Sequence, residues 1–241
     1  MKVILSGHGR MGRMVEEILT QAGDQVLGVV DQGLFEDPAQ VPGEPEVIID
    51  FSHPSCLDSL LDFAVKTGCA LVLGTTGYTP EQMQRIAQAA KAAPIVQSYN
   101  YSLGVHLLKK AVEAIAPQLL EAGFDVEIVE THHNKKADAP SGTAKLLLKA
   151  IDPEETRPRL YGREGMIGPR GHEIGIHALR GGTVAGEHSV YFFGEDETLE
   201  LRHSAASRRI FAVGAVRAAR FACGKAPGLY GMDQIVSGGK A

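Results

Sequence analysis

The first hundred residues alternate between short apolar runs and segments in which apolar residues recur every three or four positions. The second spacing is typical of amphipathic helices, as at Met14, Val15, Ile18, Leu19 and Ala22. The apolar runs predict five buried strands, at residues 2–6, 25–31, 47–52, 70–74 and 94–97. Buried strands separated by amphipathic helices favour a parallel sheet covered on both faces. We therefore expect an α/β fold with a Rossmann-like, doubly wound sheet.

The pattern changes after Asn100. A long helix is predicted over residues 103–122, and a second helix, apolar nearly all round, over residues 207–223. Segments that alternate between apolar and polar residues predict strands at 124–130, 172–179, 187–193 and 198–203. Turns separate most of these strands, which favours a mixed or antiparallel sheet. We expect a second, α+β domain over residues 102–208, with residues 1–101 and 209–241 forming the first domain.

A glycine-rich turn follows the first predicted strand. Gly7, Gly9 and Gly12 have the spacing G-x-G-x-x-G and precede a predicted helix, which is the context of the dinucleotide-binding fingerprint. Asp31 ends the second strand, 19 residues beyond Gly12, where an acidic side chain can bind the adenosine ribose. Arg10 could pair with phosphate, although it could equally be a solvated loop charge. A purely structural glycine turn is the alternative, and the combination of strand, helix and acid favours a cofactor site.

Two further polar segments come directly after predicted strands. Residues 74–77 read Gly-Thr-Thr-Gly and residues 98–101 read Ser-Tyr-Asn-Tyr. Ligands of open α/β sheets bind at the carboxyl ends of the strands, so position favours a binding role. The alternative is ordinary turn chemistry, in which glycine and threonine are common.

The segment from 127 to 144 reads EIVETHHNKKADAPSGTA and carries the densest chemistry of the chain. Ser141 is a suitable N-cap for the apolar helix that follows, and the first-turn amides at Gly142 and Thr143 could hold an anion. A solvated basic loop is one interpretation. A metal site is a second, disfavoured because adjacent histidines on a strand point opposite ways and no H-E-x-x-H or cysteine partner is present. The favoured interpretation is an anionic-substrate site with acid–base groups, which comprise His132, His133, Lys135 and Lys136.

Composition narrows the functional classes. Hydrophobic residues make up 44% and charged residues 22% of the 241 positions, which is typical of a globular protein. The net charge of −5 argues against nucleic-acid binding. Three scattered cysteines are too few for a disulfide framework or a metal-binding C-x-x-C motif, and they are Cys56, Cys69 and Cys223. No apolar run predicts a membrane span or a signal peptide, so we expect a cytoplasmic protein that binds neither membrane nor metal.

The segment 127–144 resembles, without a gap, the signature of the dihydrodipicolinate reductase family, E-I-V-E-x-H-x-x-x-K-x-D-x-P-S-G-T-A. The similarity extends over nearly the whole chain. It includes the residues Gly-Arg-Met-Gly at 9–12, Ile-Asp-Phe-Ser at 49–52, Gly-Thr-Thr-Gly at 74–77, Asn-Tyr-Ser at 100–102, Gly-Glu-His at 186–188 and Ser-Arg at 207–208.

The resemblance implies a homotetrameric reductase of the diaminopimelate and lysine pathway. Such an enzyme uses NADH or NADPH to reduce a cyclic, conjugated dicarboxylate, with a cofactor domain and a substrate-binding and oligomerisation domain. The family's roles fall on His132 as the acid–base residue, on Lys136 as the proton donor, and on His133, Gly142 and Thr143 as substrate contacts. Strands around 186–193 would contribute to the tetramer interface. Cofactor contacts fall on Gly7, His8, Gly9, Arg10, Met11, Gly12, Asp31, Gly74, Thr75, Thr76, Ser98, Tyr99, Asn100 and Tyr101.

Three departures from the family pattern affect the cofactor site. The glycine loop is one residue shorter than the common G-x-x-G-R-M-G, and the segment between Asp31 and Glu46 is short. Gln32 and His53 stand where relatives often carry arginine. An arginine beside Asp31 would bind the 2′-phosphate of NADPH, so we expect NADH to be used at least as well.

Two other functions remain open from the sequence. A non-catalytic module that senses NAD(P) would keep the glycine loop but would not need His132 and Lys136 beside an anion site. Another NAD(P)-dependent reductase of a small dicarboxylate is also compatible. A semialdehyde dehydrogenase would need a nucleophilic cysteine, and none of the three cysteines has that context.

Overall fold

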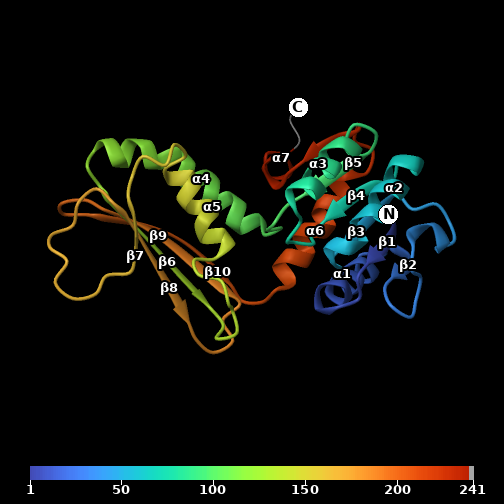
Figure 1. Ribbon diagram of the computed structural model, residues 1–241, viewed down its shortest axis with the longest axis horizontal. Coiled ribbons are helices and arrows are strands. Elements are labelled where there is room, and N and C mark those ends of the chain that lie inside the picture. The colour runs from blue at the N-terminus through green and yellow to red at the C-terminus, as the bar shows by residue number, and fades with distance from the viewer. Residues whose placement is uncertain (239–241) are drawn as a thin grey trace. The chain divides into compact units, whose positions relative to one another are not determined.

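The computed structural model describes residues 1–238, so the last three residues of the predicted segment 209–241 lie outside the description. The contacts divide the chain into two compact units (Figure 1). The first comprises residues 1–103 together with the segment from Arg208 onward, and the second comprises Gly104–Ser207. Within the described part of the chain, no helix is long and apolar enough to cross a membrane.

The first unit is built on a six-stranded sheet in the order β11-β5-β4-β3-β1-β2, with every pair of neighbours parallel. β1 has β2 on one side and β3 on the other, so the chain changes direction across the sheet at this point. Open sheets bind ligands at such a switch point. The strands are β1 (Lys2–Ser6), β2 (Gln25–Val30), β3 (Val47–Asp50), β4 (Ala70–Leu73), β5 (Pro94–Gln97) and β11 (Gly228–Tyr230).

Helices cover both faces of this sheet because successive residues of each strand point to opposite faces and are apolar on both. Val3, Val47 and Val72 pack against α1 and α6, whereas Ile4, Ile48 and their neighbours pack against α2 and α3. The predicted doubly wound fold is therefore confirmed. The helices are α1 (Arg10–Gln21), α2 (Leu57–Thr67), α3 (Pro80–Ala89), α6 (Arg209–Ala222) and α7 (Met232–Val236), with short 3₁₀ turns at Pro38–Gln40 and Pro54–Cys56.

Helix α6 packs within the first unit through small residues. Ala212, Ala215 and Ala219 are fully buried. A Cβ at Gly214 would stand 1.7 Å from the carbonyl oxygen of Tyr101, so only glycine allows this close approach. Arg209 donates to the carboxylate of Glu17 on α1 at 3.1 Å.

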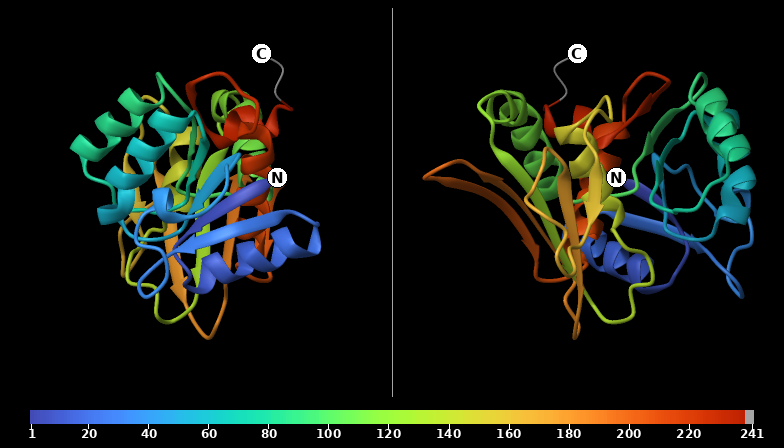
Figure 2. Two further views of the ribbon diagram at one scale, coloured as in Figure 1. Left: turned by 90° about the vertical axis from the view of Figure 1, so that its right-hand side faces the viewer. Right: turned by 60° about the vertical axis from the view of Figure 1, so that its left-hand side comes forward.

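The second unit holds a five-stranded mixed sheet in the order β10-β9-β6-β8-β7. β6 is parallel to β8 and antiparallel to β9, which agrees with the predicted mixed sheet. Helices α4 (Leu103–Glu121) and α5 (Gly142–Ile151) belong to the apolar layer on this sheet, which Figure 2 shows from two further directions. The strands are β6 (Asp125–His132), β7 (Arg159–Tyr161), β8 (Ile174–Arg180), β9 (Gly186–Phe193) and β10 (Thr198–Ala205).

Alternation along β6 determines which polar residues become buried. Val126 and Ile128 face the apolar layer, and the same side of the strand continues with Glu130 and His132, both buried. β6 runs two residues beyond the predicted end at 130, because His132 still pairs in register with Arg180 of β8. The fold thus carries a carboxylate and an imidazole into the buried layer next to α5.

Candidate active site

The three glycines of the first loop differ in what a side chain at each position would meet. Gly7 has a φ of +87°, and a Cβ there would stand 2.5 Å from the carbonyl oxygen of Phe51. A Cβ at Gly12 would stand 2.0 Å from the carbonyl oxygen of Gly7. At Gly9, by contrast, a Cβ would meet no atom of the described chain within 4 Å. Packing within the protein therefore explains Gly7 and Gly12, whereas Gly9 leaves open space beside the loop where a ligand can approach the backbone.

A pocket of about 610 Å³ lies at the carboxyl ends of β1, β2 and β3, the switch point of the sheet. Four of the predicted cofactor residues line it, namely Gly7, His8, Gly9 and Asp31. The pocket also has lining residues that were not predicted as contacts, including Gln32, Phe51, Ser52 and His53. Their place at the end of a buried strand was the signal that could have identified Ser52 and His53.

Backbone amides hold the Asp31 side chain in this pocket. Its Oδ2 accepts from the His8 N–H at 2.5 Å and its Oδ1 accepts from the Gln32 N–H at 2.7 Å. The same loop begins α1, in which Arg10 is exposed and Met11 packs against the core. The helix N-terminus and the carboxylate are the two parts that bind the pyrophosphate and the ribose in dinucleotide sites.

The remaining predicted cofactor residues lie outside the lining of this pocket. Arg10, Met11 and Gly12 belong to α1, and the others follow β4 and β5. Gly74 packs so closely on Phe51 that a Cβ would stand 2.3 Å from the ring. Buried Thr75 accepts from the Ser52 N–H at 2.9 Å through its Oγ1, which joins the ends of β4 and β3. Thr76 is exposed.

After β5, the predicted contacts differ in exposure. Tyr99 is exposed, whereas the Tyr101 ring is buried and its hydroxyl donates to the Leu73 carbonyl at 2.8 Å. Ser98 donates to the Asn100 carbonyl at 2.7 Å, and the Asn100 side chain accepts from the Ser102 N–H. The Tyr101 side chain therefore stabilises the core.

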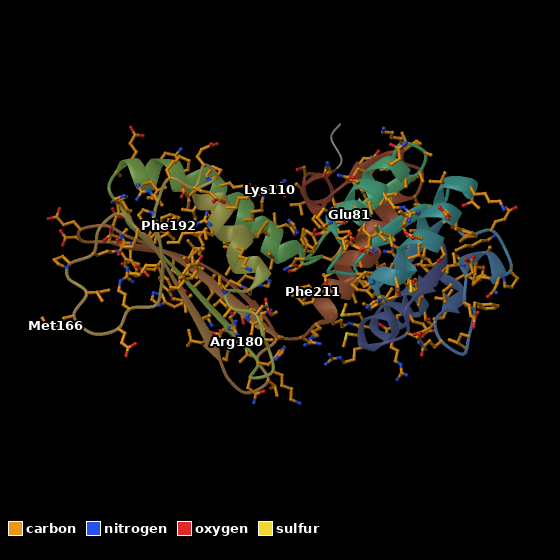
Figure 3. The ribbon with its side chains drawn as sticks, viewed as in Figure 1. Glu81, Lys110, Met166, Arg180, Phe192 and Phe211 are labelled. Atoms are coloured by element: carbon orange, nitrogen blue, oxygen red, sulfur yellow. The ribbon has the colours of Figure 1, made fainter. Side chains whose placement is uncertain are left out.

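The second cluster centres on Glu130, whose carboxylate is fully buried. Its Oε2 lies 2.5 Å from His132 Nδ1. Arg180 donates to both of its oxygens at 2.8 Å, and the Ser141 N–H donates to Oε1 at 3.0 Å. Figure 3 labels Arg180, the last residue of β8. Sequence spacing gave no signal for Arg180, since only the pairing of β6 with β8 brings it to a residue 50 positions away.

The electrostatics fix the protonation states of this pair. Burial raises the pKa of the Glu130 carboxyl, but hydrogen bonds from Arg180 and His132 outweigh it, and the pKa lies below its usual value. Burial, together with the charges of Lys136 and Arg180, outweighs the raising effect of Glu130, so the pKa of His132 lies below its usual value. At neutral pH the carboxylate is therefore ionised and the imidazole neutral. An ionised carboxylate only accepts hydrogen bonds, so His132 carries its proton on Nδ1 and presents Nε2 as an acceptor.

Lys136 lies in the loop after β6. Its Nζ is 2.8 and 3.0 Å from the two oxygens of Asp138, and this contact keeps the pKa of the Asp138 carboxyl below its usual value. The Lys136 charge also lowers the pKa of His132, so the ammonium acts on the imidazole electrostatically. His133 is half-buried and Lys135 is exposed. The loop therefore places one ammonium, Lys136, in the cluster with His132.

The N-terminus of α5 completes the cluster. Ser141 caps the helix by accepting from the Ala144 N–H at 3.1 Å, as predicted, and its Oγ lies 3.0 Å from Nε2 of His188. Gly142 and Thr143 are the first two residues of the helix. No described atom would lie within 4 Å of a Cβ at Gly142, so the open space there suits an approaching anion.

His188 of β9 is a further member of the cluster, to which the sequence assigned no role in the site. Its ring lies edge-on to that of His132, with centroids 5.1 Å apart. Burial is the main cause that lowers the pKa of His188 to about 4, so the ring is neutral. The cluster as a whole combines a neutral proton acceptor, an ammonium donor and helix-end amides. Such a set can bind a carboxylate and transfer protons.

Comparison with known families decides between the interpretations that the sequence left open. The model described as dihydrodipicolinate reductase, N-terminus, matches residues 1–101, and the model of the C-terminus matches residues 104–236. The chain belongs to the dihydrodipicolinate reductase family. The family predicted from the signature segment is thereby confirmed, and both clusters lie within the matched regions.

Individual relatives agree over nearly their full length. The chain is 43% identical over 239 residues to the 4-hydroxy-tetrahydrodipicolinate reductase of Exiguobacterium sp., covering 98% of this chain and 95% of the relative. It is 45% identical over 234 residues to the enzyme of the same name from Akkermansia muciniphila, covering 95% and 94%. Among solved structures, a dipicolinate-bound dihydrodipicolinate reductase from Paenisporosarcina sp. TG-14 has a TM-score of 0.77 at 25% identity, covering 98% of this chain and 99% of that one.

Proposed function

We propose that this chain is a 4-hydroxy-tetrahydrodipicolinate reductase, which uses NADH or NADPH to form tetrahydrodipicolinate in diaminopimelate and lysine biosynthesis. The observation that carries the proposal is the cluster around His132, in which a carboxylate-held imidazole, the Lys136 ammonium and the N-terminus of α5 occur together. The relatives that bear this name cover nearly the whole chain, and one solved relative holds dipicolinate, a planar ring dicarboxylate.

The residues divide the chemistry between them. The amides of Gly142 and Thr143 bind one substrate carboxylate, with His133 as a further substrate contact. The hydroxylated substrate loses its hydroxyl group and a ring proton as water, which gives the conjugated ring. When bound, the nicotinamide would supply a hydride to that ring, so two electrons and one hydrogen enter the substrate. The electron pair displaced along the conjugated system takes up a proton from the Lys136 ammonium. His132 is neutral and its Nε2 is a hydrogen-bond acceptor, so it orients the substrate and is the acid–base partner of Lys136.

The pocket at the switch point suits a dinucleotide. Open space beside Gly9 allows backbone approach at the N-terminus of α1, and the Asp31 carboxylate lies in the same pocket. We assign the cofactor to this pocket, with the residues after β4 and β5 towards its nicotinamide end. Because Gln32 lies beside Asp31 in place of a cation, a 2′-phosphate would meet a negative charge, which favours NADH at least equally with NADPH.

The domain roles and the assembly follow the same proposal. Residues 1–101 and 209–241 form the cofactor domain, and residues 102–208 form the substrate-binding and oligomerisation domain of a cytoplasmic homotetramer. Stacked rings of Tyr191 and Phe193 lie at the end of β9, with Phe193 exposed. Met166, labelled in Figure 3, is fully exposed in the segment that precedes β8. Exposed apolar side chains of this kind favour contact with further copies of the chain.

A direct assay tests the proposed reaction. A synthase generates the hydroxylated substrate in the cuvette, and oxidation of the reduced nicotinamide is followed by absorbance. We expect oxidation that depends on both the substrate and the chain. Binding of NADH without oxidation would instead indicate a nucleotide-sensing module, and oxidation only with a different dicarboxylate would indicate another reductase.

A further inference from the structure

The Glu130 carboxylate accepts hydrogen bonds from three residues on different elements, which are His132 of β6, Arg180 of β8 and Ser141 at the start of α5. Its Oε2 accepts from His132 at 2.5 Å and from Arg180 at 2.8 Å. Its Oε1 accepts from the Ser141 N–H at 3.0 Å and from Arg180 at 2.8 Å. Each oxygen therefore has two donors, which use the acceptor capacity of a buried carboxylate fully.

This arrangement determines which nitrogen of His132 is available. The ionised Glu130 requires a proton on Nδ1, so the neutral ring has its lone pair on Nε2. Gly186 lies beside that nitrogen, and a Cβ at this position would stand 3.1 Å from Nε2. Glycine at 186 therefore keeps the space next to the reactive nitrogen open.

The same carboxylate also anchors the anion-binding end of α5. Ser141 is the N-cap of the helix, and its amide donates to Glu130. The first-turn residues Gly142 and Thr143 follow directly. One buried side chain thus sets the position of the proton acceptor and that of the carboxylate-binding amides at the same time.

We propose that Glu130 is the positioning residue of this site, holding His132 in its Nδ1–H form and fixing the N-terminus of α5 against it. Its effect on turnover rests on the proposed function, whereas the protonation of His132 does not. Glu130 acts through His132 and Ser141, because donors of the protein occupy both oxygens of its buried carboxylate.

The chain offers a matched comparison on the same strand. Glu127 is also a β6 carboxylate that contacts two arginines and a histidine, which are Arg163, Arg170 and His177. It lies on the other side of the strand from Glu130, because the two differ by an odd number of positions. If a carboxylate of this type serves only to stabilise the sheet, changing Glu127 and changing Glu130 should have similar effects.

The first test uses the unaltered protein. Selective ¹⁵N labelling of the nine histidines, with His132 assigned by loss of its signals in His132→Gln, reports which ring nitrogen carries the proton. We expect protonated Nδ1 and unprotonated Nε2 at neutral pH. The opposite tautomer in the unaltered protein would overturn the proposal before any variant of Glu130 is made.

The second test is Glu130→Gln. The Ser141 N–H is part of the backbone and cannot turn away, so the single amide oxygen must take the place of Oε1. The amide NH₂ then faces Nδ1 of His132 and donates to it, which moves the ring proton to Nε2. We expect that inverted tautomer together with a loss in kcat of about 100-fold or more, as tautomer inversion causes in hydrolase triads. The KM for NADH should be unchanged, since the cofactor pocket is lined by other residues.

The pH dependence gives an independent readout. The charged or titratable groups that act on His132 are Glu130, Lys136, Arg180 and His188. Removing the one negative charge among them leaves only groups that disfavour the imidazolium, so His132 in Glu130→Gln should titrate at lower pH than in the wild type.

The outcomes separate the two proposals. Glu127→Gln should keep the wild-type tautomer of His132 and its kcat, with the oligomeric state checked by light scattering. Unchanged tautomer and unchanged kcat in Glu130→Gln would overturn the positioning role, and so would equal losses in the two variants. If the wild type reduces nothing, the proposed function fails, and the tautomer of the unaltered protein still decides the role of Glu130.

Discussion

His132 and Arg180 lie opposite each other on the neighbouring strands β6 and β8, and the same carboxylate, that of Glu130, contacts both side chains. The register of the sheet therefore places a cation, an anion and an imidazole in one buried cluster. A register shift by one residue would turn Glu130 and His132 to the other face of the sheet. The integrity of this strand pair is thus a condition for the chemistry.

Lys136→Ala should remove the proton donor and leave the cofactor pocket intact. We expect kcat to fall about 100-fold or more, while the dissociation constant for NADH measured by fluorescence titration stays at the wild-type value. Lys135→Ala, which removes the exposed neighbouring ammonium, is the control and should change kcat little. Turnover near the wild-type level in Lys136→Ala would show that Lys136 is not the donor.

The two glycines Gly9 and Gly12 should respond differently to the same substitution. Gly9→Ala adds a methyl group to open space, so the melting temperature should stay close to that of the wild type. If the cofactor approaches there, its KM should rise about tenfold, the effect of roughly 1.4 kcal/mol. Gly12→Ala should unfold the loop, because the new Cβ would stand 2.0 Å from the Gly7 carbonyl oxygen. An unchanged KM in Gly9→Ala would place the pyrophosphate elsewhere.

Buried His188 should make the fold sensitive to mild acid. Burial is the main cause that lowers its pKa from 6.5 to about 4, so the unfolded chain binds the proton more readily than the folded one. Stability is therefore unaffected above pH 6.5 and is lost as the pH falls from there towards 4. The loss is on the order of 3 kcal/mol at most. The free energy of unfolding, measured in urea at several pH values, should fall less steeply with decreasing pH in His188→Gln than in the wild type. The same pH dependence in both proteins would contradict this prediction.

The cofactor preference should depend on the residue after Asp31. With Gln32 present, kcat/KM for NADH should equal or exceed that for NADPH. Gln32→Arg supplies a cation for the 2′-phosphate and should raise kcat/KM for NADPH about tenfold, with little change for NADH. A strong preference of the wild type for NADPH would refute the interpretation of Asp31 and Gln32.

Much of this architecture could be predicted from the sequence because its signals are local. The apolar runs of the first hundred residues correspond to β1–β5, and the predicted cap Ser141 begins α5. β7 and β11 were not predicted, since each has three residues and no clear apolar alternation. Strand pairing, rather than any intrinsic preference, makes these short segments strands.

The site was predicted only as far as it is continuous in the chain. His132 and Lys136 were identified within the signature segment, and the structure places both of them near one another. Arg180 joins through a contact that spans 50 residues, and His188 through one that spans 47. No spacing rule reaches that far, because these contacts depend on the register of β8 and β9 beside β6.

Transfer of label from the cofactor tests the central claim most directly. Synthase-generated substrate is incubated with the protein and NADH deuterated at C4 of the nicotinamide on the transferred face, and the ring product is examined by mass spectrometry. We expect a single deuterium in tetrahydrodipicolinate for each NADH consumed, with Lys136→Ala slowing its appearance. The assignment would be contradicted if NADH binds the protein but delivers no deuterium to this product, whichever face of the nicotinamide carries the label.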